Sequence, residues 1–142
     1  MISLRKKIMV GAAQLGEKYG SFNREQKQSA SSAKQFLNEA LSFGIDKLDT
    51  AFGYTNSEDF IGQSDVSNKF TITTKIPRID NLNIEDSDVV KLKGCISASL
   101  KRLRCDSVGA LLAHSANDLL KPGAQQLYDS LVQQKEEGVT QK

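Results

Sequence analysis

The sequence predicts an α/β protein in which parallel strand–helix units form about half of a (β/α)8 TIM barrel. Short runs rich in β-branched residues alternate with longer segments whose apolar residues recur at helical spacing. Polar residues stand where successive strand candidates end, as in barrels that carry a reaction site at one rim. A chain of 142 residues is ordinarily one domain. We therefore expect residues 1–142 to form a single truncated barrel domain.

The first unit combines a short strand candidate, a loop and a clear helix. Residues Lys7–Ala13 form an apolar run, and glycines interrupt Leu15–Asn23, which is typical of a loop. Over Ser29–Phe43 the apolar residues fall on one side at helical spacing, and Gly44 is a common helix stop. The apolar residues of this predicted helix are Ala33, Phe36, Leu37, Ala40 and Leu41.

The second and third units follow the same order. Ile45–Ala51 is the second strand candidate, and Ser57–Gln63 is a short predicted helix with Ser57 as its N-cap. The third strand candidate, Phe70–Ile76, is rich in β-branched residues and ends before Pro77. Each unit therefore pairs one strand with one helix.

The fourth unit lies between the longest helix candidate and the end of the sequence. Asp86–Arg104 is predicted to be helical, Val108–His114 to be a strand, and Ala124–Glu137 to be a helix ending at Gly138. From Val139 onward the residues are typical of the opening of a fifth strand. The apolar side of the first helix is formed by Val89, Leu92, Ile96, Leu100 and Leu103.

Two architectures fit this alternation of strands and helices. Both have parallel strands joined by right-handed crossovers: an open doubly wound sheet, or part of a (β/α)8 barrel. A dinucleotide-binding open sheet has Gly-x-Gly-x-x-Gly between its first strand and helix. Here the glycines are Gly11, Gly16 and Gly20, which are too widely spaced and lead into a loop. The glycine spacing favours the barrel.

The composition restricts the kinds of partner. Hydrophobic residues make up 39% and charged residues 25% of the chain, which is typical of a soluble globular protein. The formal net charge is +2, and the basic run Arg5-Lys6-Lys7 is too short for a nucleic-acid surface. No segment approaches the about 18 consecutive apolar residues that cross a bilayer. We expect a cytoplasmic protein with no nucleic-acid or membrane partner.

The two cysteines give no sign of a metal site. Cys95 and Cys105 lack metal-ligand spacing and have no histidine nearby in the sequence. We expect both to be reduced thiols and predict no metal ligands in the chain.

Four polar residues mark the ends of successive strand candidates. Asp49 is near the end of the second strand, Lys75 of the third and His114 of the fourth, and Tyr54 is in the loop after the second. Catalytic side chains of (β/α)8 barrels come from these strand ends. Alternation within the third strand puts Lys75 on the same face as Thr73, which would line the barrel interior. The four side chains are therefore predicted to meet at one rim.

Together these four residue types suit the reduction of a carbonyl group. A tyrosine hydroxyl can supply the proton, but the ordinary tyrosine pKa of about 10 is too high for efficient transfer at neutrality. An ammonium about 4 Å away favours phenolate by up to roughly 4 kcal/mol at an effective dielectric constant of about 20. Asp49 would hold Lys75 in place, and His114 would orient the carbonyl oxygen.

Each of these residues also has an ordinary structural interpretation. A tyrosine after a strand is commonly a half-buried packing residue, and a lysine at a strand end commonly reaches solvent. A lone histidine after Leu111-Leu112-Ala113 is commonly a core residue. The site hypothesis depends on finding the right residue types together, in order and at successive strand ends.

The chain resembles the aldo/keto reductase family. Asp49-Thr50-Ala51-Phe52-Gly53-Tyr54, with Asn56-Ser57-Glu58 after it, is similar to the family's Asp-Thr-Ala-x-x-Tyr signature. Gly11-Ala12-Ala13-Gln14-Leu15-Gly16 is similar to the opening strand and loop of a bacterial branch. Glu137-Gly138-Val139 is similar to the approach to the fifth strand.

This resemblance implies an oxidoreductase that reduces an aldehyde or ketone with NADPH or NADH. It implies that Tyr54 is the proton donor, that Asp49 and Lys75 tune it, and that His114 positions the carbonyl of a small-molecule substrate. Ala12, Ala13 and Asp49 would lie near the nicotinamide end of the cofactor.

The sequence also departs from the family in length. Eight units make a complete barrel, whose phosphate-binding loops follow strands seven and eight. A half-barrel leaves open sheet edges and an uncovered apolar face, which are prone to association. We expect poor solubility, dimerisation through the first and fourth strands, or folding only with a complementary half-barrel. The alternative function is a non-catalytic half-barrel remnant or interaction subunit.

Overall fold

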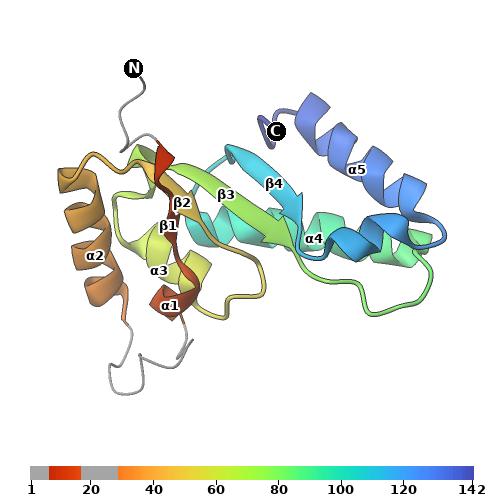
Figure 1. The fold of residues 1–142 in the computed structure, drawn as a ribbon, viewed down its shortest axis with the longest axis horizontal. Helices are drawn as coiled ribbons and strands as arrows, with labels where there is room; N and C mark the ends of the chain where they lie inside the picture. The colour runs from red at the N-terminus through yellow and green to blue at the C-terminus, as the bar shows by residue number, and fades with distance from the viewer. Residues whose placement is uncertain (1–6, 17–28) are drawn as a thin grey trace.

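The computed structural model describes residues 7–16 and 29–142, and its centre is a parallel sheet of four strands. The strands are β1 (Val10–Gly11), β2 (Lys47–Asp49), β3 (Thr71–Ile76) and β4 (Ala110–Ala113). They lie side by side in chain order, β1-β2-β3-β4. Figure 1 shows helix α2 (Ala30–Ser42) beside the β1 end and α5 (Ala124–Glu136) beside the β4 end.

The strand order decides between the two predicted architectures. A doubly wound open sheet reverses direction at a switch point, so that its first strand lies inside the sheet. Here every strand pairs with its neighbour in the sequence, and all pairs are parallel. This arrangement is that of consecutive units of a (β/α)8 barrel, and it confirms the predicted parallel half-barrel.

The helices lie where the sequence predicts them. Helix α2 is capped by Ser29, whose hydroxyl accepts from the Ser32 backbone N–H at 3.1 Å, and Gly44 after it has a left-handed φ of 74°. Helices α3 (Ser57–Gln63) and α4 (Asp86–Leu103) follow β2 and β3, and α5 follows β4. Short 3-10 turns at Ser67–Lys69 and Ala116–Leu120 were not predicted.

The first two strands are shorter than predicted. Instead of a strand over Lys7–Ala13, β1 has two residues, and helix α1 (Ala13–Gly16) begins directly after Ala12. The Ala12 N–H still donates to the Asp49 carbonyl at 2.8 Å, but its own carbonyl accepts from Leu15, which turns the chain. Beyond Gly16 the predicted loop lies outside the described residues. Strand β2 likewise covers three residues of the predicted Ile45–Ala51.

The two faces of the sheet differ in polarity. Residues that are Cα partners in the register lie on the same face of the sheet. One of the two faces is apolar and faces the helices. It carries Val10, Leu48, Ile72, Ile76 and Leu111, with Thr74 as its polar member. The other face carries Gly11, Lys47, Asp49, Thr71, Thr73, Lys75, Ala110 and Leu112.

The prediction of an uncovered apolar face is therefore wrong. The core lies between the apolar face and the helices, and Leu37, Leu48, Ile61, Leu103 and Leu127 are fully buried in it. The opposite face presents mainly lysine, aspartate and threonine side chains. Leu112, 45% exposed, is its one large apolar side chain among the paired residues.

The edge at β4 is also less open than predicted, because the last residues of the chain lie along it. Thr140 pairs in parallel with Val108, whose N–H donates to Val139 at 3.0 Å and whose carbonyl accepts from Gln141 at 3.2 Å. The Leu111 N–H donates to the Lys142 carbonyl at 3.0 Å. These bonds form a parallel bridge at the place where the sequence predicts the opening of a fifth strand.

Helices α3 and α4 approach each other closely at a glycine. A Cβ atom added to Gly62 would lie 2.0 Å from the carbonyl oxygen of Arg102. Real side chains do not tolerate that distance, so only glycine lets the two backbones come this near. The contact places the last turn of α4 against the short helix that follows Tyr54.

Gly62→Ala should therefore lower the free energy of unfolding by about 1–3 kcal/mol, because the new methyl group must push the α4 backbone away. Gly94→Ala is the matched control on the exposed side of α4, where an added Cβ meets no atom within 4 Å. This control should be neutral or raise the free energy of unfolding by about 0.4–1 kcal/mol. Urea unfolding midpoints compare the two variants, and equal effects would contradict the close approach.

Candidate active site

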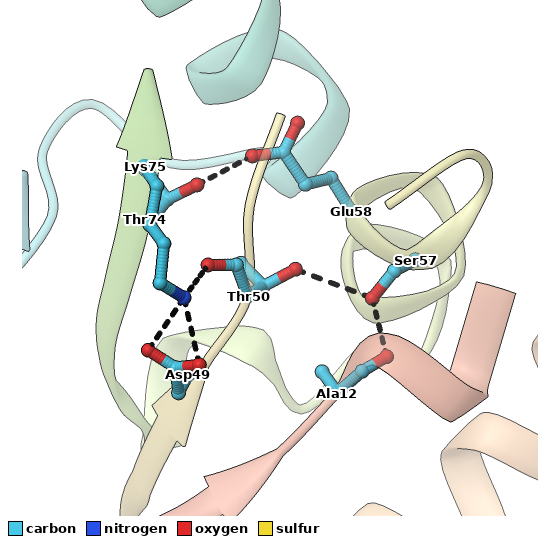
Figure 2. A network of polar contacts seen from close by, with 7 residues as sticks. All are labelled: Ala12, Asp49, Thr50, Ser57, Glu58, Thr74 and Lys75. Atoms are coloured by element: carbon cyan, nitrogen blue, oxygen red, sulfur yellow. Dashed lines mark hydrogen bonds and ion pairs between the residues drawn. The ribbon is translucent and has the colours of Figure 1, made fainter. Parts of the chain in front are cut away.

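Lys75 and Asp49 form an ion pair at the polar face of the sheet. The Lys75 Nζ donates to Asp49 Oδ1 at 2.8 Å and to Oδ2 at 2.7 Å, and also to the Thr50 carbonyl oxygen at 2.8 Å (Figure 2). An ammonium has three N–H donors, so these contacts use all of them. The side chains are 16% and 32% exposed, so the pair remains reachable from the open face.

The register of β2 and β3 explains how the pair forms. Asp49 is the Cα partner of Thr73, and Lys75 is the next residue of β3 on the same face. The Cα atom of Lys75 therefore lies about 6.6 Å further along β3 than that of Thr73, the residue beside Asp49. Its long side chain folds back over Thr73 toward the carboxylate and the end of β2.

Tyr54 and His114 lie next to this ion pair. The Lys75 Nζ is 5.3 Å from the centroid of the Tyr54 ring. The His114 ring is edge-on to Tyr54, with centroids 5.9 Å apart and planes at 81°. Tyr54 is half-buried and His114 is exposed. The structure thus brings together all four side chains that the sequence singled out, at the ends of three neighbouring strands.

The two alanines predicted near the cofactor have different surroundings. Ala12 is fully buried, its N–H donates to Asp49, and its carbonyl accepts from Leu15 and from the Ser57 hydroxyl. Ala13 begins α1 and is half-buried. Of the two, Ala13 has surface that a ligand can touch.

A buried pair of hydroxyl groups links the chain segments that carry the site. The Thr50 and Ser57 hydroxyls are 3.2 Å apart, and Ser57 Oγ donates to the Ala12 carbonyl at 2.8 Å (Figure 2). Both residues are fully buried. They connect the end of β1, the end of β2 and the start of α3.

The structure corrects the predicted role of Ser57. It is the first residue of α3, and the N-cap position is Asn56, which makes no side-chain cap bond. A serine in front of a short helix is typically an N-cap, so the sequence does not indicate that the Ser57 hydroxyl points inward to the Ala12 carbonyl. The signal that could have found it is the adjacent Glu58, an acidic residue on the buried side of the same helix.

In the part of the chain that the structure describes, the cysteines and the possible metal ligands form no second site. Burial raises the pKa of both the Cys95 and the Cys105 thiol, which makes them poor nucleophiles. Both cysteines are free. Within residues 7–16 and 29–142 no group of three or more His, Cys, Asp or Glu side chains could hold a metal ion. In the same ranges no helix is long and apolar enough to span a bilayer.

Comparison with known proteins identifies the family. Residues 7–141 match the Aldo/keto reductase family, which is nearly the whole chain. This chain belongs to the aldo/keto reductase family. Its four-stranded parallel sheet is accordingly part of that family's (β/α)8 barrel.

Solved aldo-keto reductases have the same fold over part of their length. PA4992 from Pseudomonas aeruginosa, assigned to the aldo-keto reductases, is 23% identical with a TM-score of 0.72, over 92% of this chain and 51% of its own. The aldo-keto reductase of Bombyx mori, solved in complex with NADP, is 19% identical with a TM-score of 0.62, over 94% of this chain and 44% of its own. None of the curated proteins compared with the chain matches it.

These alignments agree on how much of the family's fold is present. The chain spans about half the length of the solved aldo-keto reductases it matches. At these identities the likeness shows the fold. The chemistry of the site therefore has to be argued from the residues of this chain.

Ser57→Ala should lower the free energy of unfolding by about 1–3 kcal/mol, because the buried Thr50 hydroxyl loses its partner. Ser97→Ala is the control: its hydroxyl bonds to the Lys93 carbonyl on the exposed side of α4, and its effect should stay within about 0.5 kcal/mol. Urea unfolding measures both variants. A loss no greater than that of the control would show that the Thr50–Ser57 contact is not formed.

Proposed function

We propose that this chain carries the proton-delivery half of an NAD(P)H-dependent reductase acting on an aldehyde or ketone. The observation that carries the proposal is the gathering of Tyr54, Lys75, Asp49 and His114 at one accessible rim. Membership of the aldo/keto reductase family supports the reaction class. A small-molecule carbonyl compound is the substrate class.

In this proposal Tyr54 donates a proton to the carbonyl oxygen. Lys75 favours the phenolate that remains, and it does so through its charge. Its three N–H groups are already bonded to Asp49 and Thr50, so none is left for a hydrogen bond to the phenol oxygen. Asp49 accepts two of the ammonium's hydrogen bonds and so fixes it beside the ring.

His114 has a different task. It is exposed on the open side and meets Tyr54 edge-on. From there an imidazole N–H can donate to the same carbonyl oxygen that Tyr54 protonates. This contact would hold the oxygen at the phenol and polarise the carbonyl bond.

We propose that Asp49 and Ala13 lie against the nicotinamide end of NADPH or NADH. Asp49 and Ala13 keep accessible surface, whereas the N–H and carbonyl of Ala12 are bonded to other groups of the chain. When bound, the cofactor supplies hydride to the carbonyl carbon. The Bombyx mori structure in complex with NADP supports NADPH as the cofactor. We propose a cytoplasmic location, where free thiols such as Cys95 and Cys105 persist.

One observation favours a second candidate, a non-catalytic half-barrel remnant or interaction subunit. The chain covers 51% of the Pseudomonas aeruginosa structure. In (β/α)8 barrels the phosphate-binding loops commonly follow strands seven and eight, and the described sheet has four strands. A half-barrel could keep Tyr54, Lys75, Asp49 and His114 together and still bind the cofactor too weakly for turnover.

Titration with NADPH, followed by cofactor fluorescence, separates the two candidates. The reductase proposal predicts saturable binding and turnover of small aldehydes. Tyr54→Phe should keep the binding and lose turnover by a factor of at least about 100, because it removes only the proton donor. Tyr128→Phe, which changes an exposed tyrosine on α5, is the control. Retained turnover in Tyr54→Phe would defeat the assignment, and absence of NADPH binding would favour the remnant.

We further propose that the 142-residue chain associates through its sheet edges, with itself or with a complementary half-barrel. Light scattering should give a mass above the monomer's 15.6 kDa that rises with concentration. Met9→Lys adds a charge next to the β1 edge and should reduce association. Val90→Lys, on the exposed side of α4, should not. A cooperatively melting monomer at all concentrations would refute this proposal.

A further inference from the structure

Glu58 is a buried carboxylate that the proposed reaction does not use. Its side chain is 1% exposed, and every oxygen has a partner. Oε1 accepts from the Thr74 hydroxyl at 2.7 Å, and Oε2 accepts from the Ser99 hydroxyl at 3.0 Å. The Arg102 Nε lies 3.4 Å from Oε2 and forms an ion pair with it. Glu58 thus joins α3 to β3 and α4.

The first connection to the site runs through β3. Thr74 directly precedes Lys75, and neighbouring residues of a strand point to opposite faces. Figure 2 shows Thr74 directed toward Glu58 and Lys75 directed toward Asp49 from the same strand. A bond that fixes Thr74 on the helix side therefore fixes the backbone from which Lys75 extends on the open side.

The second connection runs through the loop that carries Tyr54. The Arg102 guanidinium lies 4.3 Å from the centroid of the Phe52 ring, which is a cation–π contact. The Phe52 N–H donates to the Lys75 carbonyl at 3.1 Å. Phe52 stands two residues before Tyr54, so its backbone holds this loop against β3 and its ring holds the loop against α4.

The chemistry of the pair points to a role beyond general stability. Replacing a buried ion pair with apolar residues of similar volume is often neutral or stabilising, so such a pair is weak evidence of a stability role. What this pair provides is a fixed arrangement of two segments: Glu58 accepts a hydrogen bond from Thr74, while Arg102 forms an ion pair with Glu58 and lies over the Phe52 ring. The Arg102 Nε donates its own hydrogen bond to the Ala98 carbonyl within α4. The contacts to Thr74 and Phe52 hold the two segments that carry the ammonium and the phenol.

We propose that Glu58 and Arg102 form a positioning pair that sets the placement of Tyr54 relative to Lys75 and His114 from the opposite face of the sheet. The inference rests on the proposed function only in treating that rim as the reaction site. It predicts a change in geometry at Tyr54 when either contact is removed.

His114 offers a direct probe of this geometry. It is the one histidine of the chain, so its imidazole resonances need no assignment by comparison. Its ring stands edge-on to Tyr54, so the ring current of the phenol displaces those resonances. Tyr54→Leu removes the ring and defines their position without it. Spectra at one alkaline pH keep the imidazole protonation the same in every variant.

Glu58→Gln and Phe52→Leu are the test variants in the 142-residue chain. Glu58→Gln removes the ion pair, and Phe52→Leu removes the cation–π contact without leaving a buried charge unpaired. Both should move the His114 resonances most of the way toward their position in Tyr54→Leu. Leu131→Ala is the control: it removes apolar packing on α5, a helix that carries neither Glu58, Arg102 nor Phe52, and should leave the resonances in place.

The outcomes separate a positioning role from a structural one. If Glu58→Gln fails to fold, Phe52→Leu alone decides. The proposal would be overturned if the His114 resonances stay in place in a folded Phe52→Leu variant. It would also be overturned if they stay in place in a Glu58→Gln variant that folds but melts at a lower temperature than the unsubstituted chain. The readout does not involve turnover. Displaced resonances in a chain that does not bind NADPH would therefore support the positioning pair while the reductase proposal fails.

Discussion

The parallel register between β2 and β3 is the constraint on which the site depends. It makes Asp49 the partner of Thr73, so that Lys75 extends from the same face one pleat further on. From there the ammonium reaches both carboxylate oxygens and the Thr50 carbonyl, which exhausts its donors. A shift of one residue would turn Lys75 toward the helices, into the apolar core. The ion pair and the sheet register therefore depend on each other.

The polarity of the two sheet faces follows from the same alternation. Residues such as Leu48 and Ile72 meet the helices, while Asp49 and Thr73 face the open side. In a closed barrel the open side would be the interior. Its polar character explains how a half-length chain can present a sheet face without a large exposed apolar surface. The end of the chain pairs in parallel with Val108, just before β4, and so continues the sheet in the same direction.

Much of this structure could be predicted from the sequence, for physical reasons that differ by element. Helix α2 and strand β3 were found because apolar periodicity and β-branched residues act locally. The four rim residues were found because strand ends meet at one edge. The lengths of β1 and β2 cannot be predicted from local patterns, because strand pairing and the turn after Ala12 determine where these strands end. The contacts of Ser57 and the Glu58–Arg102 ion pair cannot be predicted from the sequence either, because they depend on which helices pack together.

The site depends on the Lys75 ammonium being held by Asp49 and Thr50 beside the Tyr54 ring. Side-chain ammonium protons normally exchange too fast to observe, but three hydrogen bonds slow their exchange. ¹⁵N-edited NMR at neutral pH should show a protected lysine ammonium that is absent in Lys75→Met and that has nuclear Overhauser contacts to the Tyr54 ring protons. A Lys75 ammonium that exchanges as fast as the exposed lysines, or one without contacts to Tyr54, would contradict the account.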